Sequence, residues 1–117
     1  MEEKKMLRKL IISLFGLVMV HVMAPAPASA IENHLSEAIV HAREAVAAGR
    51  EGKSSALVLH ATNALEHANA AQRERPNAHV KKAIVRLHEA ITFGKAKRRA
   101  ATTIADRALQ ELERAPK

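Results

Sequence analysis

The 117-residue chain has no cysteine, tryptophan or tyrosine, and only two phenylalanines. The lack of cysteine excludes a disulfide framework, a thiolate nucleophile, Cys-ligated zinc and a lipid-modified cysteine. A chain of this length has room for one domain at most. Its formal net charge is +7, which by itself suggests an anionic partner such as nucleic acid or a membrane surface.

The first 30 residues have the parts of an export signal. A basic start leads into an apolar run over residues 10–24, and a Pro-Ala stretch ends in Ala28-Ser29-Ala30, the small-x-small pattern that signal peptidase accepts. The run is shorter than the ~20 residues that span a bilayer. We therefore expect cleavage after Ala30, an exported domain over residues 31–117, and membrane contact only through the signal peptide. An uncleaved anchor is the alternative.

Removal of the signal lowers the net charge to +5 and leaves six histidines and one aromatic residue, Phe93. One aromatic side chain gives nucleic-acid bases no stacking platform, so we expect no nucleic-acid partner. The sequence also has no glycine-rich phosphate loop, no His-Glu-x-x-His motif and no obvious catalytic triad. We therefore expect no enzymatic activity.

The remaining 87 residues have a helical pattern, because 20 of them are alanine and apolar residues recur three and four positions apart. We expect helices over about residues 33–49, 54–73, 79–93 and 96–115. Asn33 and Asn77 are candidate N-caps, and Gly49 and Gly94 are candidate C′ residues. Because short connections make successive helices antiparallel neighbours, the sequence predicts an all-α, up-down four-helix bundle.

The second half of this domain repeats the first. A shift of 45 residues superposes residues 34–40 on residues 79–85 and Gly49 on Gly94, with seven identical pairs over 16 positions. The bundle is therefore predicted to consist of two duplicated helical hairpins, about residues 33–73 and 77–115.

Four histidines flank the apolar seam of the first hairpin. His34 and His41 of the first helix, and His60 and His67 of the second, take the g positions of heptads. Residues seven apart lie about 10.5 Å apart along a helix, too far to hold one ion. In an antiparallel pair, however, residues at one level have a constant sum of residue numbers, and this sum is 101 for both His34 with His67 and His41 with His60. We predict two His-His rungs, one heptad apart.

Each rung has a carboxylate near it, because Glu37 follows His34 by three residues and Glu44 follows His41 by three. Two imidazoles and one carboxylate at one level suit a divalent ion with open positions for water. The alternative is that the histidines are boundary residues of an alanine-rich helix and that the glutamates pair with arginines on a solvated face.

The same register gives the second hairpin fewer ligands. It places His79 opposite Glu111 and Arg86 opposite Ile104, and it leaves His88 outside the seam as a surface residue. We therefore expect metal binding mainly on the first hairpin.

The segments His34–Gly52 and Leu59–Ala68, with a second copy that opens at His79, resemble the small metal-binding protein family of exported bacterial proteins. The resemblance covers nearly the whole chain after the signal. It implies a helical periplasmic protein that binds copper and other divalent metals and takes part in metal buffering. It also implies ligand roles for His34, His41, His60, His67 and His79.

The ligand types narrow the choice of ion. Without a thiolate or thioether the domain has no soft ligand that Cu(I) would prefer, whereas imidazole with carboxylate suits Cu(II), Ni(II), Zn(II) and Co(II). Cu(II) binds most tightly of these at equal availability. We expect an exported copper(II)-binding protein that buffers or sequesters metal. The alternative is a structural or partner-binding helical bundle that has lost most of its metal ligands.

One basic cluster, Lys95, Lys97, Arg98 and Arg99, lies between the third and fourth predicted helices. It is either a solvated loop, whose first basic side chains interact favourably with the C-terminal end of the preceding helix dipole, or a weak contact for an anionic surface or an acidic partner.

Overall fold

The structure, a computed structural model, describes the backbone of residues 30–117 and the side chains of residues 34–117. The predicted signal peptide lies outside the described residues except for Ala30, so its cleavage stays a prediction. None of the described helices has both the length and the hydropathy that a membrane crossing requires.

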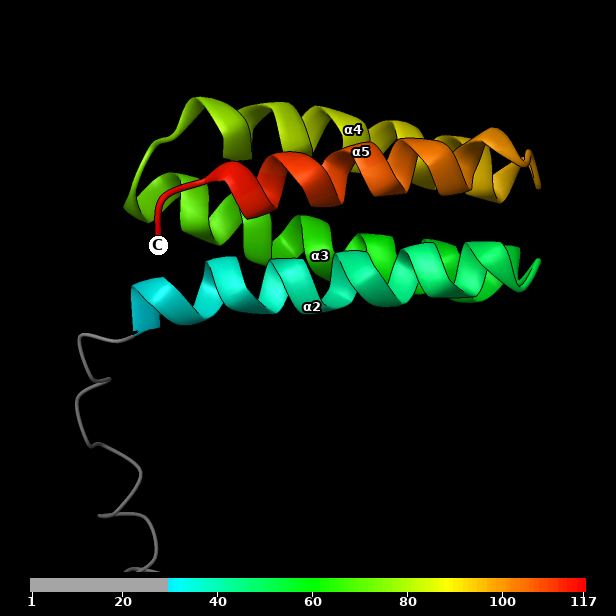
Figure 1. Cartoon of the computed structure of the whole chain (residues 1–117), viewed down its shortest axis with the longest axis horizontal. Helices are drawn as coiled ribbons and strands as arrows, with labels where there is room; N and C mark the ends of the chain where they lie inside the picture. The colour runs from blue at the N-terminus through cyan, green and yellow to red at the C-terminus, as the bar shows by residue number, and fades with distance from the viewer. Residues whose placement is uncertain (1–29) are drawn as a thin grey trace, which may run out of the picture.

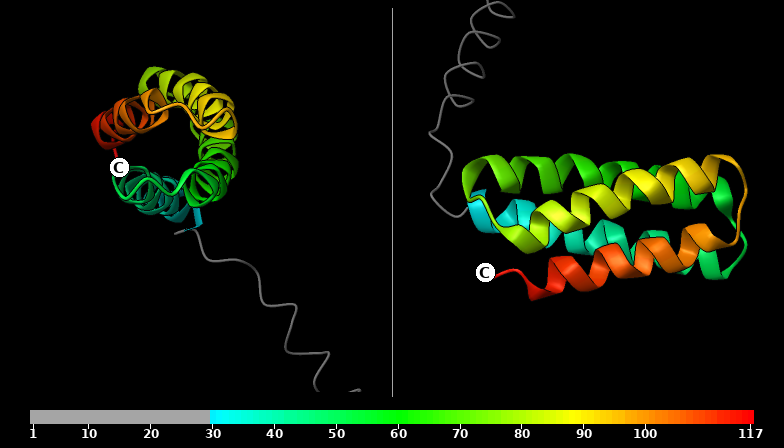
Figure 2. Two further views of the ribbon diagram at one scale, coloured as in Figure 1. Left: turned by 90° about the vertical axis from the view of Figure 1, so that its right-hand side faces the viewer. Right: turned by 90° about the horizontal axis from the view of Figure 1, so that it is seen from above.

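Four helices and no strand make up the described residues, which confirms the predicted all-α class. They are α2 (Ala30–Arg50), α3 (Ser54–Glu74), α4 (Ala78–Lys95) and α5 (Ala100–Arg114). They lie side by side, with the α2–α3 and α4–α5 connections at one end and the α3–α4 connection at the other (Figure 1). Seen end-on, they surround a common axis, and α2 and α4 each pack against both α3 and α5 (Figure 2).

The core of the bundle consists mainly of alanine. The fully buried alanines are Ala38, Ala42, Ala45, Ala61, Ala64, Ala68, Ala83, Ala90, Ala105 and Ala108. Only three large side chains, those of Leu57, Leu87 and Leu112, are also completely enclosed, and no polar or charged residue in the described part of the chain is buried. Polar chemistry is therefore confined to the edges of the helix interfaces.

Gly49 and Gly94 allow close packing around Leu57. Both glycines lie inside helices rather than at the predicted C′ positions, because α2 and α4 continue past them. A Cβ on Gly49 would lie 2.8 Å from Leu57 Cδ1, and a Cβ on Gly94 would lie 3.1 Å from Leu57 Cδ2. The side chain of Leu57 on α3 therefore occupies space beside both glycines. It shares this space with Thr102 at Gly49 and with Val58 at Gly94, which would lie still closer to the added Cβ atoms.

The helices α2 and α4 end in the same backbone motif, 45 residues apart. Gly52 and Lys97 have left-handed backbone conformations, with φ of 74° and 55°. Each donates its N–H to the carbonyl three residues earlier at 3.0 Å, and the next residue donates to the carbonyl five residues earlier at 2.9 Å. These are Schellman motifs with Gly52 and Lys97 as the C′ residues.

Replacement of Lys97 by glycine is expected to raise the free energy of unfolding by about 1 kcal/mol. A residue with a side chain costs about 1–2 kcal/mol in the left-handed region, and the relief of this cost is partly offset because glycine loses more backbone entropy on folding than lysine does. Urea unfolding measures the change. Lys95→Gly, in the last turn of α4, is the matched control and is expected to cost up to about 1 kcal/mol. Equal destabilisation by both glycines would show that Lys97 carries no strain.

The helix starts agree only partly with the expected caps. Asn77 caps α4 as predicted, since its side chain accepts hydrogen bonds from two backbone N–H groups of the first turn at 2.8 and 3.2 Å. Asn33 is not an N-cap, because α2 begins three residues earlier, at Ala30. The last helix begins at Ala100 rather than near residue 96, because the Schellman turn takes up the intervening residues.

Candidate metal centre

Four histidines form a continuous row along the interface of α2 and α3. His34 and His41 come from α2, and His60 and His67 come from α3. Each is directly followed by a buried core residue and is itself partly exposed. The row therefore runs along the rim of the alanine core, where imidazoles reach both the opposite helix and solvent.

The structure brings both predicted pairs together. His34 Nδ1 lies 3.2 Å from His67 Nδ1, and the rings of His41 and His60 are stacked with centroids 6.2 Å apart. The ring of His41 also stacks on that of His67, with centroids 5.6 Å apart and an angle of 7° between the planes. The four imidazoles thus form one connected row rather than two separate rungs.

Glu44 lies between His41 and His60. Its Oε2 atom is 3.1 Å from His41 Nδ1 and 2.9 Å from His60 Nδ1. The second contact is short enough for a hydrogen bond but lacks its direction, so the buried His60 Nδ1 has no hydrogen-bond partner. Two ligand atoms that are each about 2.0–2.2 Å from a shared ion lie roughly 3 Å apart. The spacing of these atoms therefore suits ligands of one ion.

Glu37 supplies a second carboxylate on the other side of His41, with its Oε2 atom 4.0 Å from His41 Nε2. The set Glu37, His41 and His67 offers three ligand atoms within 4.8 Å of one another, and so does the set His41, Glu44 and His60. From the sequence, Glu37 was paired with His34, three residues earlier, but in the structure it contacts His41, four residues later. Both spacings place side chains on one helix face.

His34 lies outside both three-residue sets. Its Nε2 atom is 3.8 Å from Glu74 Oε1, and its Nδ1 atom faces His67. If His67 donates from Nδ1 to His34, the lone pair of His67 Nε2 stays free for an ion. Glu74 is not among the ligands predicted from the sequence, although it follows His67 by seven residues and so continues the same row of g positions.

The second hairpin contributes one pair of this kind. His79 Nδ1 lies 2.8 Å from Glu111 Oε2, as the register predicts, and this hydrogen bond lowers the pKa of Glu111 from its usual range. At the next level the guanidinium of Arg86 donates to Glu89 at 3.1 Å. His88 is exposed. Within the described residues, both three-ligand sets therefore lie on α2 and α3.

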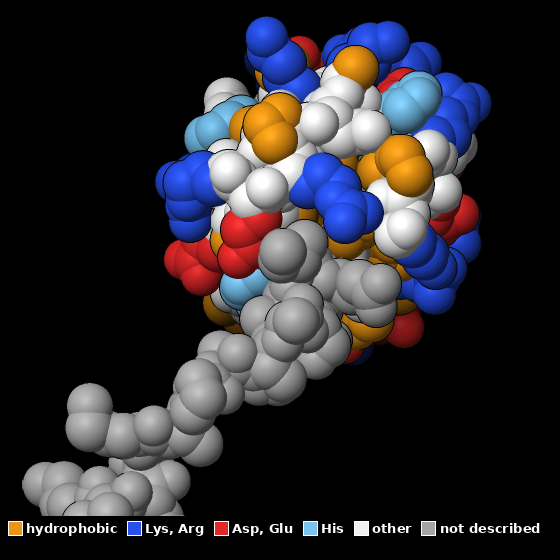
Figure 3. All heavy atoms as spheres, turned by 90° about the vertical axis from the view of Figure 1, so that its left-hand side faces the viewer, with side chains coloured by type: hydrophobic (Ala, Val, Ile, Leu, Met, Phe, Trp, Pro, Cys, Tyr) orange, Lys and Arg blue, Asp and Glu red, His pale blue; other side chains and the backbone are white. Residues whose placement is uncertain are grey.

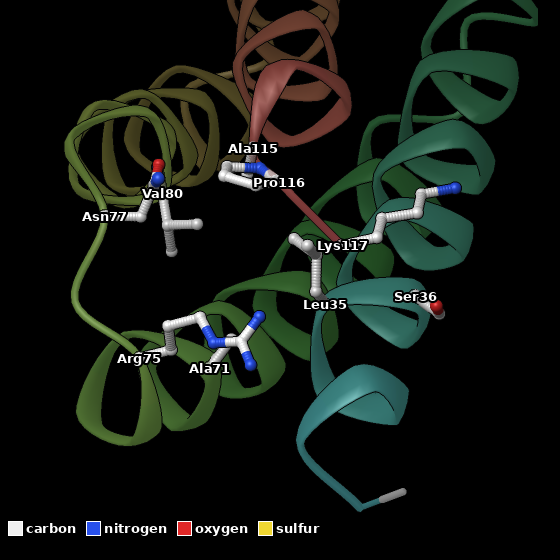
Figure 4. Close-up of a pocket in the computed structure, with 9 residues that line it drawn as sticks. All are labelled: Leu35, Ser36, Ala71, Arg75, Asn77, Val80, Ala115, Pro116 and Lys117. Atoms are coloured by element: carbon white, nitrogen blue, oxygen red, sulfur yellow. The ribbon is translucent and has the colours of Figure 1, made fainter.

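A cavity of about 190 Å³ opens at the end of the bundle where α3 connects to α4. Its walls are formed by both polar and apolar residues, and the guanidinium of Arg75 is directed across it towards Leu35 (Figure 4). Lysine and arginine side chains lie around much of this end, with acidic, histidine and hydrophobic side chains among them (Figure 3). None of the four histidines of the row lines the cavity, so it is separate from the ligand sets.

The sequence matches the family model described as small metal-binding protein over residues 4–115. The chain belongs to the small metal-binding protein family. The match includes both hairpins of the chain and all four histidines of the row, and it confirms the resemblance found from the histidine-containing segments. No curated protein matches the chain.

Proposed function

We propose that the protein binds divalent metal ions at the row of histidines and glutamates between α2 and α3. The observation that carries the proposal is the set of His41, Glu44 and His60, in which a buried ring nitrogen lacks a hydrogen-bond partner beside a carboxylate oxygen. Among the residues whose side chains the structure describes, the ion-pair contacts of Glu37 and Glu44 are with histidines and not with arginines. This contact pattern favours a ligand site over a solvated face.

We propose Cu(II) as the preferred ion and Ni(II), Zn(II) and Co(II) as ions that bind the same site more weakly. Imidazole nitrogen and carboxylate oxygen suit all four ions, and Cu(II) forms the most stable complexes among them. The chain has no cysteine, and all four of its methionines precede residue 30. Residues 31–117 therefore have no soft sulfur ligand that would select Cu(I).

The proposed role is metal buffering in the periplasm after export. Export is supported by the basic start, the short apolar run and the Ala28-Ser29-Ala30 end of the predicted signal peptide. Exchange with solvent is supported by exposure, since the side chains of His41 and Glu37 are 23% and 53% exposed. Ligands that remain open to water suit an ion that is taken up and released.

We also propose that the antiparallel bundle arose by duplication of one hairpin. Two observations support this: the paired Schellman motifs of Gly52 and Lys97, and the contact of His79 with Glu111, which corresponds to that of His34 with His67. On this proposal the second hairpin has lost ligands that the first retains.

Titration calorimetry with Cu(II) tests the metal-binding proposal. The double variant His41→Ala/His60→Ala is expected to raise the Kd on the order of a hundredfold, whereas His88→Ala, which alters an exposed histidine outside the row, is expected to leave it unchanged. Binding should weaken as the solution is made more acidic, because protonated imidazoles cannot act as ligands. Equal binding by the double variant and the parent would contradict the assignment.

The alternative function is a structural or partner-binding bundle that has lost its ligands. Arg86 supports it, because a guanidinium, which cannot coordinate a metal, corresponds by the repeat to His41. This alternative predicts no Cu(II) binding in the same titration.

The basic cluster Lys95, Lys97, Arg98 and Arg99, which is fully on the surface, remains a proposed weak contact for anionic lipid. Sedimentation with anionic vesicles at low and high salt tests this contact.

A further inference from the structure

His41 belongs to both three-ligand sets. Glu44 approaches it from the Nδ1 side at 3.1 Å, and Glu37 lies on the Nε2 side at 4.0 Å. His60 completes the first set and His67 the second. The two sets therefore use opposite sides of one imidazole ring.

A neutral imidazole has a lone pair on one nitrogen and a proton on the other. His41 can therefore coordinate an ion through Nδ1 or through Nε2, but it can coordinate two ions only if it also loses its N–H proton. Two divalent ions on one ring would repel each other with four times the energy of two unit charges at that distance. Glu37 and Glu44 together carry enough negative charge to neutralise one divalent ion. Protonation and charge thus both favour a single ion.

We infer that the row holds one divalent ion at a time in either of two overlapping positions that share His41. One position is completed by Glu44 and His60, and the other by Glu37 and His67. The ion passes between them when His41 exchanges the nitrogen that binds it, and the ring proton moves to the nitrogen that the ion leaves, by way of solvent. The inference rests on the proposed function, because it specifies the number and the movement of ions at the same site.

The test is titration calorimetry with Cu(II) on a set of variants, all carrying His79→Ala and His88→Ala so that the second hairpin, whose α4 holds both residues, contributes no histidine ligand. The parent is expected to bind one equivalent. His60→Ala and His67→Ala are each expected to bind one equivalent, with at least one of them within about tenfold of the parent Kd, since each keeps one complete position. His41→Ala and the double variant His60→Ala/His67→Ala are each expected to raise the Kd on the order of a hundredfold.

Each other outcome has a defined meaning. A stoichiometry other than one in the parent, an affinity of His41→Ala within tenfold of the parent, or complete loss of binding in either single variant would overturn the shared-ligand inference. Absence of Cu(II) binding by the parent would instead overturn the proposed function itself. Circular dichroism checks that each variant keeps its helix content, and the double variant gives the same readout if His41→Ala fails to fold.

Discussion

Replacement of Leu57 by alanine is expected to lower the free energy of unfolding by about 4 kcal/mol, near the upper end of the range for buried leucines. Leu57 is 1% exposed, and its two methyl groups lie against Gly49 and Gly94. The two glycines have no side chain that can turn into the vacated space, and Val58 and Thr102, which also lie beside them, are β-branched and stiff at χ1, so the cavity should collapse little. Domains of this size have total stabilities of about 5–15 kcal/mol, so the variant should unfold at much lower denaturant concentration.

Leu59→Ala is the matched control for this prediction. Leu59 lies on the same helix two residues later, and it is 59% exposed. Its replacement is expected to change stability by less than about 0.5 kcal/mol. The free energies of unfolding are measured by urea unfolding monitored at 222 nm. Similar decreases in the two variants would show that the packing of Leu57 against the two glycines contributes no special stability.

Saturating Cu(II) is expected to stabilise the folded protein by about 2.7 kcal/mol at a free concentration of 100 times the Kd. The ligands of α2 and α3 meet only when the two helices are packed, so the unfolded chain should bind the ion much less tightly. For a domain of this length such stabilisation corresponds to an increase in Tm of roughly 10–20 °C. Thermal unfolding with and without Cu(II) measures the increase.

The stabilisation should disappear in His41→Ala/His60→Ala and persist in His88→Ala. The double variant removes two imidazoles that contact Glu44, whereas His88 is exposed and outside both ligand sets. An equal increase in Tm for all three proteins would place the bound ion elsewhere on the molecule.

The helices could be predicted because their signals are local. Alanine content and apolar spacing identify four helices, and Asn77 caps the third of them as expected. The roles of Gly49 and Gly94 could not be predicted, because a glycine near a helix end suits either a left-handed turn or a close helix contact. The choice depends on Leu57, which reaches both glycines only in the folded bundle.

The candidate site was predictable at the level of helix register and not at the level of side-chain torsions. The constant residue sum correctly paired His34 with His67 and His41 with His60, because it depends only on backbone geometry. The contact of Glu37 with His41 depends instead on rotamers, and helix periodicity permits contacts at both the third and the fourth residue. The shared position of His41 could therefore be found only in the structure.

The most direct test of the account is ¹⁵N NMR of the histidine ring nitrogens during titration with Zn(II), a diamagnetic ion that suits the same ligands. We expect the ring signals of His41, His60 and His67 to shift and those of His88 to stay unchanged. Unchanged signals for the three row histidines, or an equal shift of His88, would contradict the claim that α2 and α3 together form the metal site.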